Sequence, residues 1–442
     1  MFSGKYIWKL LLPLIVEQIF TALMGTADTM MVARVGDAAV SAVSLVDALN
    51  NLMLMVFTAT ATGGTIACAQ YLGGHDTEGA NRAARQVFLC VAVIALACCL
   101  GCVALRRPLL RAVFGSVERE VMDAAQVYFL VTALSYPFIG CYYASAALYR
   151  AAGSSGLPMA VSAIGNLLNI AGNAVFLFVF HWGVFGAALS TTLSRVFQCV
   201  AILLLHRRPG QTIVLDHYLQ IRPDWQTIKT VLRVGIPTGV ENGMFQFGKL
   251  MVQSTVATLP TAQIAAQAVV STMEYFTSMP SMAVGLGLVT VAGQCMGAGR
   301  PREARRYSII FCMISEGLVL GMGILIFFAV GPVCRLSGLS AGSTQVVARM
   351  MTMITLVKPL VWPLAFTLPN GMRAAGDVTF SMLVSAGSMW VFRVALCMVL
   401  IRGLGFGIEG VWIAMFVDWL DRDIWYTVRF IRGKWMQQHV LS

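Results

Sequence analysis

Twelve apolar segments, each long enough to cross a lipid bilayer, follow one another along this chain of 442 residues. A membrane-spanning helix needs about 20 mainly apolar residues, whereas a strand of a membrane barrel needs about ten with alternating polarity. The segments are longer than such strands and apolar on all sides. Their approximate bounds are 10–33, 44–70, 86–106, 124–148, 157–181, 184–205, 228–258, 265–294, 307–331, 346–370, 379–401 and 408–431. The sequence therefore predicts an all-α polytopic membrane protein with twelve transmembrane helices.

The composition fits a chain that is surrounded by lipid. Hydrophobic residues make up 58% of the chain and charged residues only 12%, whereas soluble proteins average about 25% charged residues. The net charge of +11 resides in loops, so no nucleic-acid partner is expected. Lysine and arginine are in excess on one side of the twelve spans, which places both termini in the cytoplasm. The N-terminus runs into the first span without a cleavage site, and we expect a monomer in the inner or plasma membrane.

The chain contains two similar halves. Shifted by 224 residues, "PLIVE" at 13–17 lies on "PTGVE" at 237–241, and the match continues without a gap over about seventy positions. "RAAG" occurs at 150–153 and again at 373–376, nearly the same distance apart. Because each half has an even number of spans, both halves point the same way across the membrane. Secondary transporters are often built from such repeats, with the binding site between them.

The longest polar stretch, with two prolines, separates the halves. We therefore predict an N-lobe of six spans over 1–205, a cytoplasmic linker over 206–229 and a C-lobe of six spans over 230–442.

The first span carries two acids, Glu17 and Asp28, after a proline, Pro13. A charge in the middle of a bilayer costs about 3 kcal/mol or more, so intramembrane acids are functional candidates by default. Eleven residues of helix are three turns plus about 20°, so both acids face the same way, about 16 Å apart. Asp28 is a candidate proton or cation acceptor, because burial favours the neutral form of a carboxyl group. The alternative is a carboxylate held by permanent hydrogen bonds. Pro13 should bend the helix, as a hinge or as a static kink.

Polar side chains in the fifth and sixth spans could serve as partners for that acid. Asn169 and Asn173 lie one turn apart on the same helix face, and Thr191 lies near the beginning of the sixth span. Buried amides need hydrogen-bond partners, and a carboxylate from the first helix would suit them. Helix–helix contacts within the membrane are the alternative role.

The second half repeats Glu17 as Glu241 but has Val252 at the position of Asp28. Lys249 follows Glu241 by two turns, and it either forms an internal ion pair or extends toward water or a head group. We leave both readings open.

Signatures of enzymes and of ATP-driven pumps are missing from the sequence. No phosphate-binding loop G-x-x-x-x-G-K-[ST] or zinc-protease H-E-x-x-H occurs. Five scattered histidines predict no metal site, and the eleven cysteines read as small packing residues. We therefore expect no enzyme, no catalytic residue and no cofactor, with an ion gradient of H⁺ or Na⁺ as the source of energy.

Several stretches resemble the multidrug and toxic compound extrusion (MATE) family of cation-coupled antiporters: "PLIVEQ", "GTADTMMVARVG", "GQCMGAGRPREARR", "YRAAG", "GMRAAGD", "WVFRVAL" and "GVWIAMFVDW". The resemblance implies a V-shaped pair of six-helix lobes with alternating access. It implies export of amphiphilic, often cationic drugs by antiport against H⁺ or Na⁺. The residues that match the cation site of one branch are Asp28, Asn169, Asn173 and Thr191, with Tyr136 similar to an aromatic residue of that site and Pro13 to the kinking proline.

Two departures from the family pattern bear on the coupling site. The family branch commonly has an aspartate where this chain has Asn173. The Na⁺-coupled branch uses acids in the seventh and tenth helices, whereas here Glu241 lies one turn earlier than that pattern and the tenth span has no acid at all. These departures favour a site in the N-lobe and leave H⁺ and Na⁺ open.

Two other functions remain as alternatives. One is a flippase for lipids or lipid-linked saccharides of the same superfamily, although few arginines are candidates for lining a central cavity. The other is a channel or receptor without coupled transport.

Overall fold

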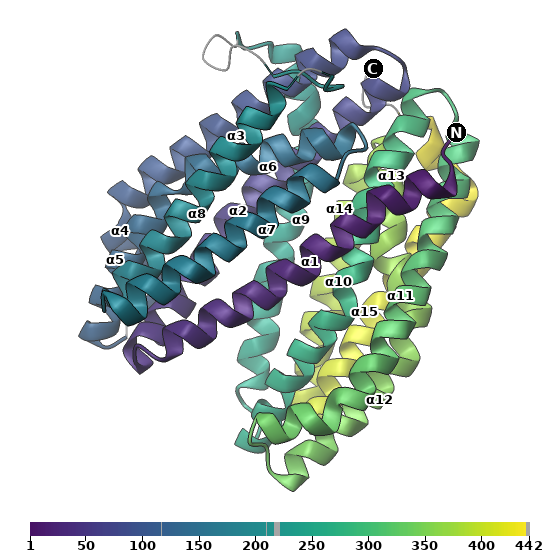
Figure 1. The fold of residues 1–442 in the computed structure, drawn as a ribbon. Helices are drawn as coiled ribbons and strands as arrows, with labels where there is room; N and C mark the ends of the chain where they lie inside the picture. The colour runs from purple at the N-terminus through teal and green to yellow at the C-terminus, as the bar shows by residue number, and fades with distance from the viewer. Residues whose placement is uncertain (116, 209, 216–221, 439–442) are drawn as a thin grey trace. The chain divides into compact units, whose positions relative to one another are not determined.

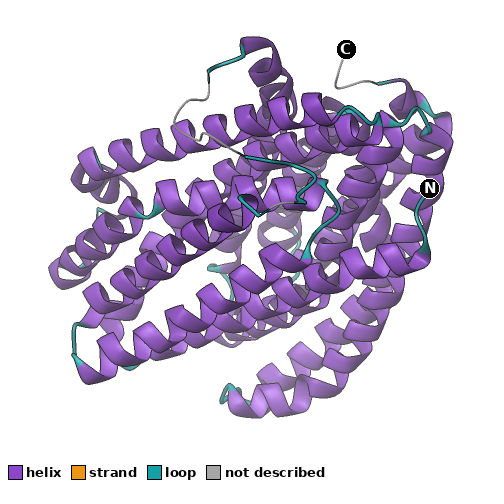
Figure 2. Cartoon of the chain, turned by 45° about the horizontal axis from the view of Figure 1, so that its top comes forward, coloured by secondary structure: helices purple, strands orange, loops and turns teal. Residues whose placement is uncertain are grey.

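The computed structural model describes residues 1–115, 117–208, 210–215 and 222–438, and these form helices, turns and loops with no strand (Figure 2). The helices fall into two compact units. One unit comprises Phe2–Gly239, and the other comprises Val240–Ser442 together with Met1. The division lies within one helix, α9 (Trp225–Val256). Parts of the predicted linker, residues 209 and 216–221, lie outside the described residues.

The first unit contains eight α-helices before α9. They are α1 (Gly4–Ala33), α2 (Asp37–Gly73), α3 (Thr77–Ala104), α4 (Arg106–Phe114), α5 (Arg119–Leu134), α6 (Tyr136–Ala151), α7 (Gly156–Asn173) with the π-helix η1 (Ala174–Val179), and α8 (Gly183–His206). Helix α2 packs against α3, α5 and α6, and α1 packs against α7 (Figure 1). Small side chains such as Ala67 and Ala144, both almost fully buried, let these helices approach closely.

The second unit contains the remaining elements. They are α10 (Thr261–Gly297), α11 (Pro301–Leu336), α12 (Ala341–Trp362), η2 (Pro363–Thr367), α13 (Leu368–Ala375), α14 (Val378–Ser388), η3 (Met389–Leu396), η4 (Val399–Gly403), α15 (Ile408–Arg432) and η5 (Lys434–Gln437). Helix α10 packs against α11, α12 and α13. Helix α15 packs against η2 and η3.

The helices confirm the twelve predicted spans. In the part of the chain that the structure describes, nine helical stretches are long and apolar enough to cross a membrane, and the bent pair α5–α6 makes a tenth. The other two spans are α9 and α15, with 32 and 25 residues, which carry more charged side chains. A continuous helix satisfies its own backbone groups, which is what a lipid environment requires.

The fourth span is not the single helix that the sequence predicted. It breaks between α5 and α6 with a bend of 45°. Pro137 lies in the first turn of α6, where its missing N–H group costs nothing, and Ser135 at the break donates its hydroxyl to the Thr132 carbonyl over 2.6 Å. Helix α1, by contrast, continues through Pro13.

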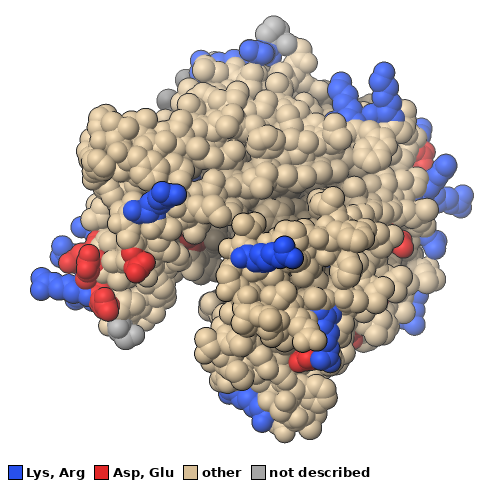
Figure 3. All heavy atoms as spheres, turned by 60° about the horizontal axis from the view of Figure 1, so that its bottom comes forward, with Lys and Arg blue, Asp and Glu red and all other residues tan. Residues whose placement is uncertain are grey.

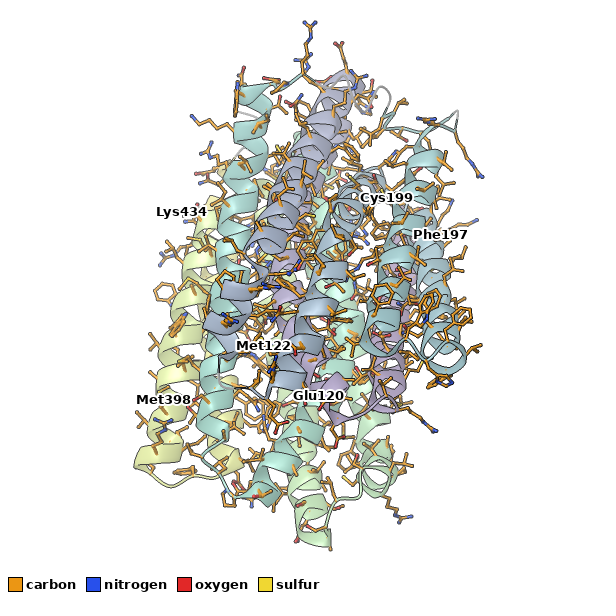
Figure 4. All side chains as sticks on the ribbon, turned by 90° about the vertical axis from the view of Figure 1, so that its left-hand side faces the viewer. Glu120, Met122, Phe197, Cys199, Met398 and Lys434 are labelled. Carbon is orange, nitrogen blue, oxygen red and sulfur yellow. The ribbon has the colours of Figure 1, made fainter. Side chains whose placement is uncertain are left out.

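Charged residues gather at the ends of helices. Glu120 in the first turn of α5 and Lys434 just after α15 are examples (Figure 4). On the face drawn in Figure 3, uncharged residues cover most of the surface, and charged side chains form separate small groups. Large apolar side chains such as Phe328 and Leu360 are 76% and 70% exposed. In a membrane protein these side chains contact lipid. All eleven cysteines are free, and most are buried, like Cys199 on α8 (Figure 4).

Candidate functional site

Asp28 and Asn173 are joined in the first unit. Asp28 lies near the end of α1, and Asn173, the last residue of α7, donates a hydrogen bond from its amide nitrogen to the carboxylate. Asn173 is fully buried, and its amide oxygen has no hydrogen-bond partner. A buried acceptor without a partner is uncommon in proteins. Two oxygen-bearing groups that favour a cation or proton are therefore adjacent.

Asn169 and Thr191 form the next layer. The amide nitrogen of Asn169 donates to the Thr191 hydroxyl over 3.2 Å, and the Ser190 hydroxyl donates to the Asn169 carbonyl over 2.7 Å. Helices α7 and α8 are thereby joined one turn away from Asn173. The structure thus brings Asp28 together with Asn173, and Asn169 together with Thr191 one helix turn away.

A second carboxylate belongs to this region, and sequence reasoning missed it. Asp47 on α2 accepts hydrogen bonds from the Asn50 amide over 3.2 Å and from the Tyr128 hydroxyl over 3.3 Å. The Tyr136 hydroxyl donates to the Asn50 oxygen over 2.8 Å. Tyr136 is thus connected to the carboxylate through Asn50, while Tyr128 contacts it directly.

The sequence alone does not single out Asp47, because the second span is predicted to begin at residue 44, only three residues before it. Helix α2 begins at Asp37, so Asp47 lies ten residues, or about 15 Å, inside it. The spacing of Asp47 and Asn50, three residues apart on one helix face, was the signal that could have identified the pair.

Asp28, Asp47 and Arg195 interact electrostatically. Arg195 also donates a hydrogen bond to the Ser135 hydroxyl over 2.7 Å. With both carboxyl groups ionised, two negative charges face one positive charge. One proton or one monovalent cation would balance the charge of this group.

Glu17 belongs to a separate ion pair. Arg150 at the end of α6 donates to both of its carboxylate oxygens, over 2.9 and 3.1 Å, and the Tyr142 hydroxyl lies 3.5 Å away. Glu17 is 7% exposed. One arginine nitrogen, Nη2, contacts both oxygens. Hydrogen bonds between charged partners are about twice as strong as neutral ones, so Glu17 is already neutralised by a protein cation.

The second unit repeats this pair. Arg373 lies 2.6 Å from the Glu241 carboxylate and donates to the Asn370 side chain over 3.0 Å. The glutamate of the "P-x-x-x-E" motif therefore contacts the arginine of the "RAAG" motif in both halves. The sequence supplied both motifs, but their pairing depends on how helices distant in sequence pack.

The lysine of the tenth span is also paired. Lys358 on α12 contacts the Glu274 carboxylate on α10, and it lies 2.6 Å from the Thr277 hydroxyl and 2.5 Å from the Ser278 hydroxyl. Lys358 is 1% exposed. The acid-free tenth span thus contributes a buried cation that joins α12 to α10.

A cavity of about 830 Å³ lies at the end of α1 in the first unit. Its lining includes Met30, Met31 and Arg34 from the end of α1, and Phe178 and His181 from the end of the fifth span. The lining is mainly apolar, with one cation and one histidine. Its first residue, Met30, follows Asp28 by two positions.

Comparisons with known proteins agree with this architecture. The MatE family matches residues 13–175 and again 237–399, about three quarters of the chain, at the same 224-residue offset as the internal repeat. The probable multidrug resistance protein NorM of Thermotoga maritima is 26% identical, over 99% of this chain and 94% of the relative. The NorM protein of Pseudomonas aeruginosa is 29% identical, over 92% of this chain and 85% of that relative.

Solved structures show the same fold. An outward-facing multidrug resistance MATE family transporter of the MOP superfamily superposes with a TM-score of 0.90 at 19% identity, covering 97% of this chain and 96% of the other. A MATE protein in complex with MaD3S gives a TM-score of 0.90 at 18% identity, with the same coverage of each chain.

Twelve spans in two similar halves, each with buried polar groups, are the features of a multi-pass membrane transporter. The chain belongs to the MatE family, as the sequence motifs indicated.

Proposed function

We propose that this protein exports amphiphilic compounds across the cell membrane by antiport against H⁺ or Na⁺, with Asp28 as the group that binds the coupling ion. One observation carries the proposal: Asp28 is held by Asn173, whose buried amide oxygen has no partner. The names of the relatives, probable multidrug resistance proteins, support drugs as the class of substrate.

The charge of the region supports ion binding at Asp28. Among the described residues, Asp28 and Asp47 share the cation Arg195, so an incoming proton or Na⁺ removes an uncompensated negative charge. Asn169 and Thr191 supply further oxygen atoms next to Asn173, and oxygen is the ligand that Na⁺ requires. Glu17 and Glu241 act differently, because each is neutralised by an arginine and holds helices together.

Coupling requires that the ion stabilise one access state over the other. An ion with equal affinity for both states would shift nothing. Pro13 supports a hinge role for α1, because the helix lacks one backbone hydrogen bond there. A change in the charge of Asp28 would then change the bend of α1 at Pro13. The family and the relatives favour this function over the flippase and channel alternatives.

The test is dye efflux in proteoliposomes driven by an imposed pH gradient and, separately, by an imposed Na⁺ gradient. Wild-type protein should move rhodamine 6G in response to at least one gradient. Asp28→Asn should abolish driven efflux while the protein remains folded and still binds the dye. Asp123→Asn, an exposed aspartate on α5, is the matched control and should transport normally. Driven efflux by Asp28→Asn at the wild-type rate would exclude Asp28 as the coupling group.

A further inference from the structure

The second unit contains an aromatic ring with cations on several sides. The ring is Phe245 on α9. The Lys249 amino nitrogen lies 5.0 Å from its centroid, and the guanidinium carbons of Arg393 on η3 and Arg422 on α15 lie 5.2 and 6.0 Å from it. All four residues belong to Val240–Ser442. Three different elements therefore bring positive charge to one side chain.

The carboxylates nearby do not balance these charges. Asp418 is shared between two arginines: it lies 2.8 Å from Arg393 and 2.9 Å from Arg422. Among the described residues, Lys249 forms no ion pair. Glu274, which interacts electrostatically with Lys249 and Arg393, is already in contact with Lys358. Three cations around Phe245 against one carboxylate leave an excess of two positive charges.

Two buried donor atoms in this cluster are unused. Each nitrogen of Arg422 has an acceptor, because Asp418, the Ser385 hydroxyl and the Ser385 carbonyl accept from it over 2.9, 2.7 and 3.1 Å. Arg393 is 5% exposed, yet its Nε and Nη2 atoms have no hydrogen-bond partner. Buried charges normally have their hydrogen bonds satisfied. An anionic group next to Arg393 would satisfy these donors and reduce the excess charge.

The cluster is also accessible from one side. Lys249 is exposed and Phe245 is half-buried, so a ligand can approach the lysine and the ring. An apolar ring beside a cation suits an amphiphile whose anionic group contacts Lys249 and Arg393 and whose apolar part packs on Phe245. A small inorganic anion would leave the ring without a role.

We propose that Lys249, Arg393 and Phe245 form a binding site for the anionic head group of an amphiphile, a carboxylate, sulfonate or phosphate. The binding claim stands on the second unit alone. That such an amphiphile is also transported rests on the proposed function. The proposal gives Lys249 a third role, that of a ligand-binding residue, beside the internal ion pair and the solvated side chain considered from the sequence.

The test measures binding of radiolabelled taurocholate, an anionic amphiphile, to the purified chain in nanodiscs of phosphatidylcholine. Lys249→Gln should raise the Kd at least tenfold, and Lys249→Arg should keep it within about threefold of wild type. Lys229→Gln, an exposed lysine on the same helix, is the matched control and should leave the Kd unchanged. Rhodamine 6G, a cationic amphiphile, should not lose affinity in Lys249→Gln.

A second arm separates the sources of the anionic group. With 30% phosphatidylglycerol in the nanodisc, a weaker apparent taurocholate affinity in wild type but not in Lys249→Gln identifies lipid head groups as occupants. Unchanged affinity identifies a dissolved amphiphile as the ligand. Equal taurocholate affinity in wild type and Lys249→Gln would overturn the proposal. Gradient-driven efflux of rhodamine 6G, measured on the same preparations, reports the proposed function independently of this result.

Discussion

At the scale of single residues, the partners of Glu17 and Asp28 set these two acids of α1 apart. Glu17 accepts two hydrogen bonds from one nitrogen of Arg150, whereas Asp28 accepts one from the Asn173 amide and interacts electrostatically with Arg195. The sequence predicted that Asp28 would meet an asparagine of the fifth span, because buried amides and acids seek each other. It could not predict the arginine at Glu17, since nothing in a single sequence states which arginine reaches which helix.

Removing one partner of the Glu17–Arg150 pair should destabilise the protein strongly. Breaking a buried pair leaves an uncompensated charge and costs about 3–5 kcal/mol. We expect Glu17→Ala and Arg150→Ala each to lower the free energy of unfolding by that amount, and the double variant to lose less than the sum of the two. Reversible unfolding in detergent micelles measures this. Additive losses would show that the two side chains do not interact.

The same cost should appear at Glu241 and Arg373, because the second half repeats the pair at 2.6 Å. An exposed pair, Arg119 and Asp123 at 3.9 Å, serves as the comparison. Surface pairs at this distance contribute about 0–1 kcal/mol, so Asp123→Ala should leave stability almost unchanged.

A carboxylate at residue 173 should partly replace the carboxylate of Asp47. Asp47→Asn removes one negative charge beside Asp28, so we expect ion-driven efflux to fall at least tenfold. Asn173→Asp in that background returns a carboxylate to the same region, because Asn173 contacts Asp28. Efflux in proteoliposomes should recover to within about threefold of wild type. A double variant as inactive as Asp47→Asn would mean that Asp47 acts by position rather than by charge.

At the scale of elements, prolines had different effects that the sequence alone did not separate. Pro137 coincides with the break between α5 and α6, whereas Pro13 lies within the continuous helix α1. The number and order of the spans followed from length and hydropathy, because lipid demands helices of a certain length. The break depends on where neighbouring helices supply hydrogen bonds to freed backbone groups, which is a property of packing.

Close approach of α2 and α9 provides a test of packing at this scale. A Cβ atom added at Gly63 on α2 would lie 2.6 Å from the Val231 carbonyl oxygen and 3.0 Å from the Gly235 nitrogen. Both are backbone atoms, which cannot move aside as a side chain can. Gly63→Ala should therefore destabilise the protein by about 1–3 kcal/mol.

The control for Gly63 is Gly101 on α3, where an added Cβ would have no atom within 4 Å. Gly101→Ala should be neutral or stabilise by up to about 1 kcal/mol, because alanine favours the helix. Thermal unfolding of both variants in the same detergent gives the comparison. Equal Tm values for the two variants would contradict the close contact between α2 and α9.

At the scale of the whole molecule, the two repeats keep their helix-joining residues and differ in the residues proposed for ligands. With the 224-residue offset that relates the two family matches, Glu17 corresponds to Glu241, whereas Asp28 corresponds to Val252 and Gly25 to Lys249. Asn50, which binds Asp47, corresponds to Glu274, which binds Lys358. The helix order could be predicted from the sequence because both halves repeat the same pattern. The roles of the positions at which the halves differ could be assigned only from the contacts in the structure.

This divergence predicts that the two units perform separable tasks, acid-dependent ion binding in the first and anion binding in the second. Asp28→Asn should abolish gradient-driven efflux of rhodamine 6G while keeping the Kd for taurocholate within about threefold. Lys249→Gln should raise the Kd for taurocholate at least tenfold while gradient-driven efflux of rhodamine 6G continues. Both variants are assayed in the same proteoliposome and nanodisc preparations, so differences in folding would affect both readouts together. Loss of both activities in a variant that unfolds at the wild-type Tm would show that one network serves both tasks, because independent sites give independent losses.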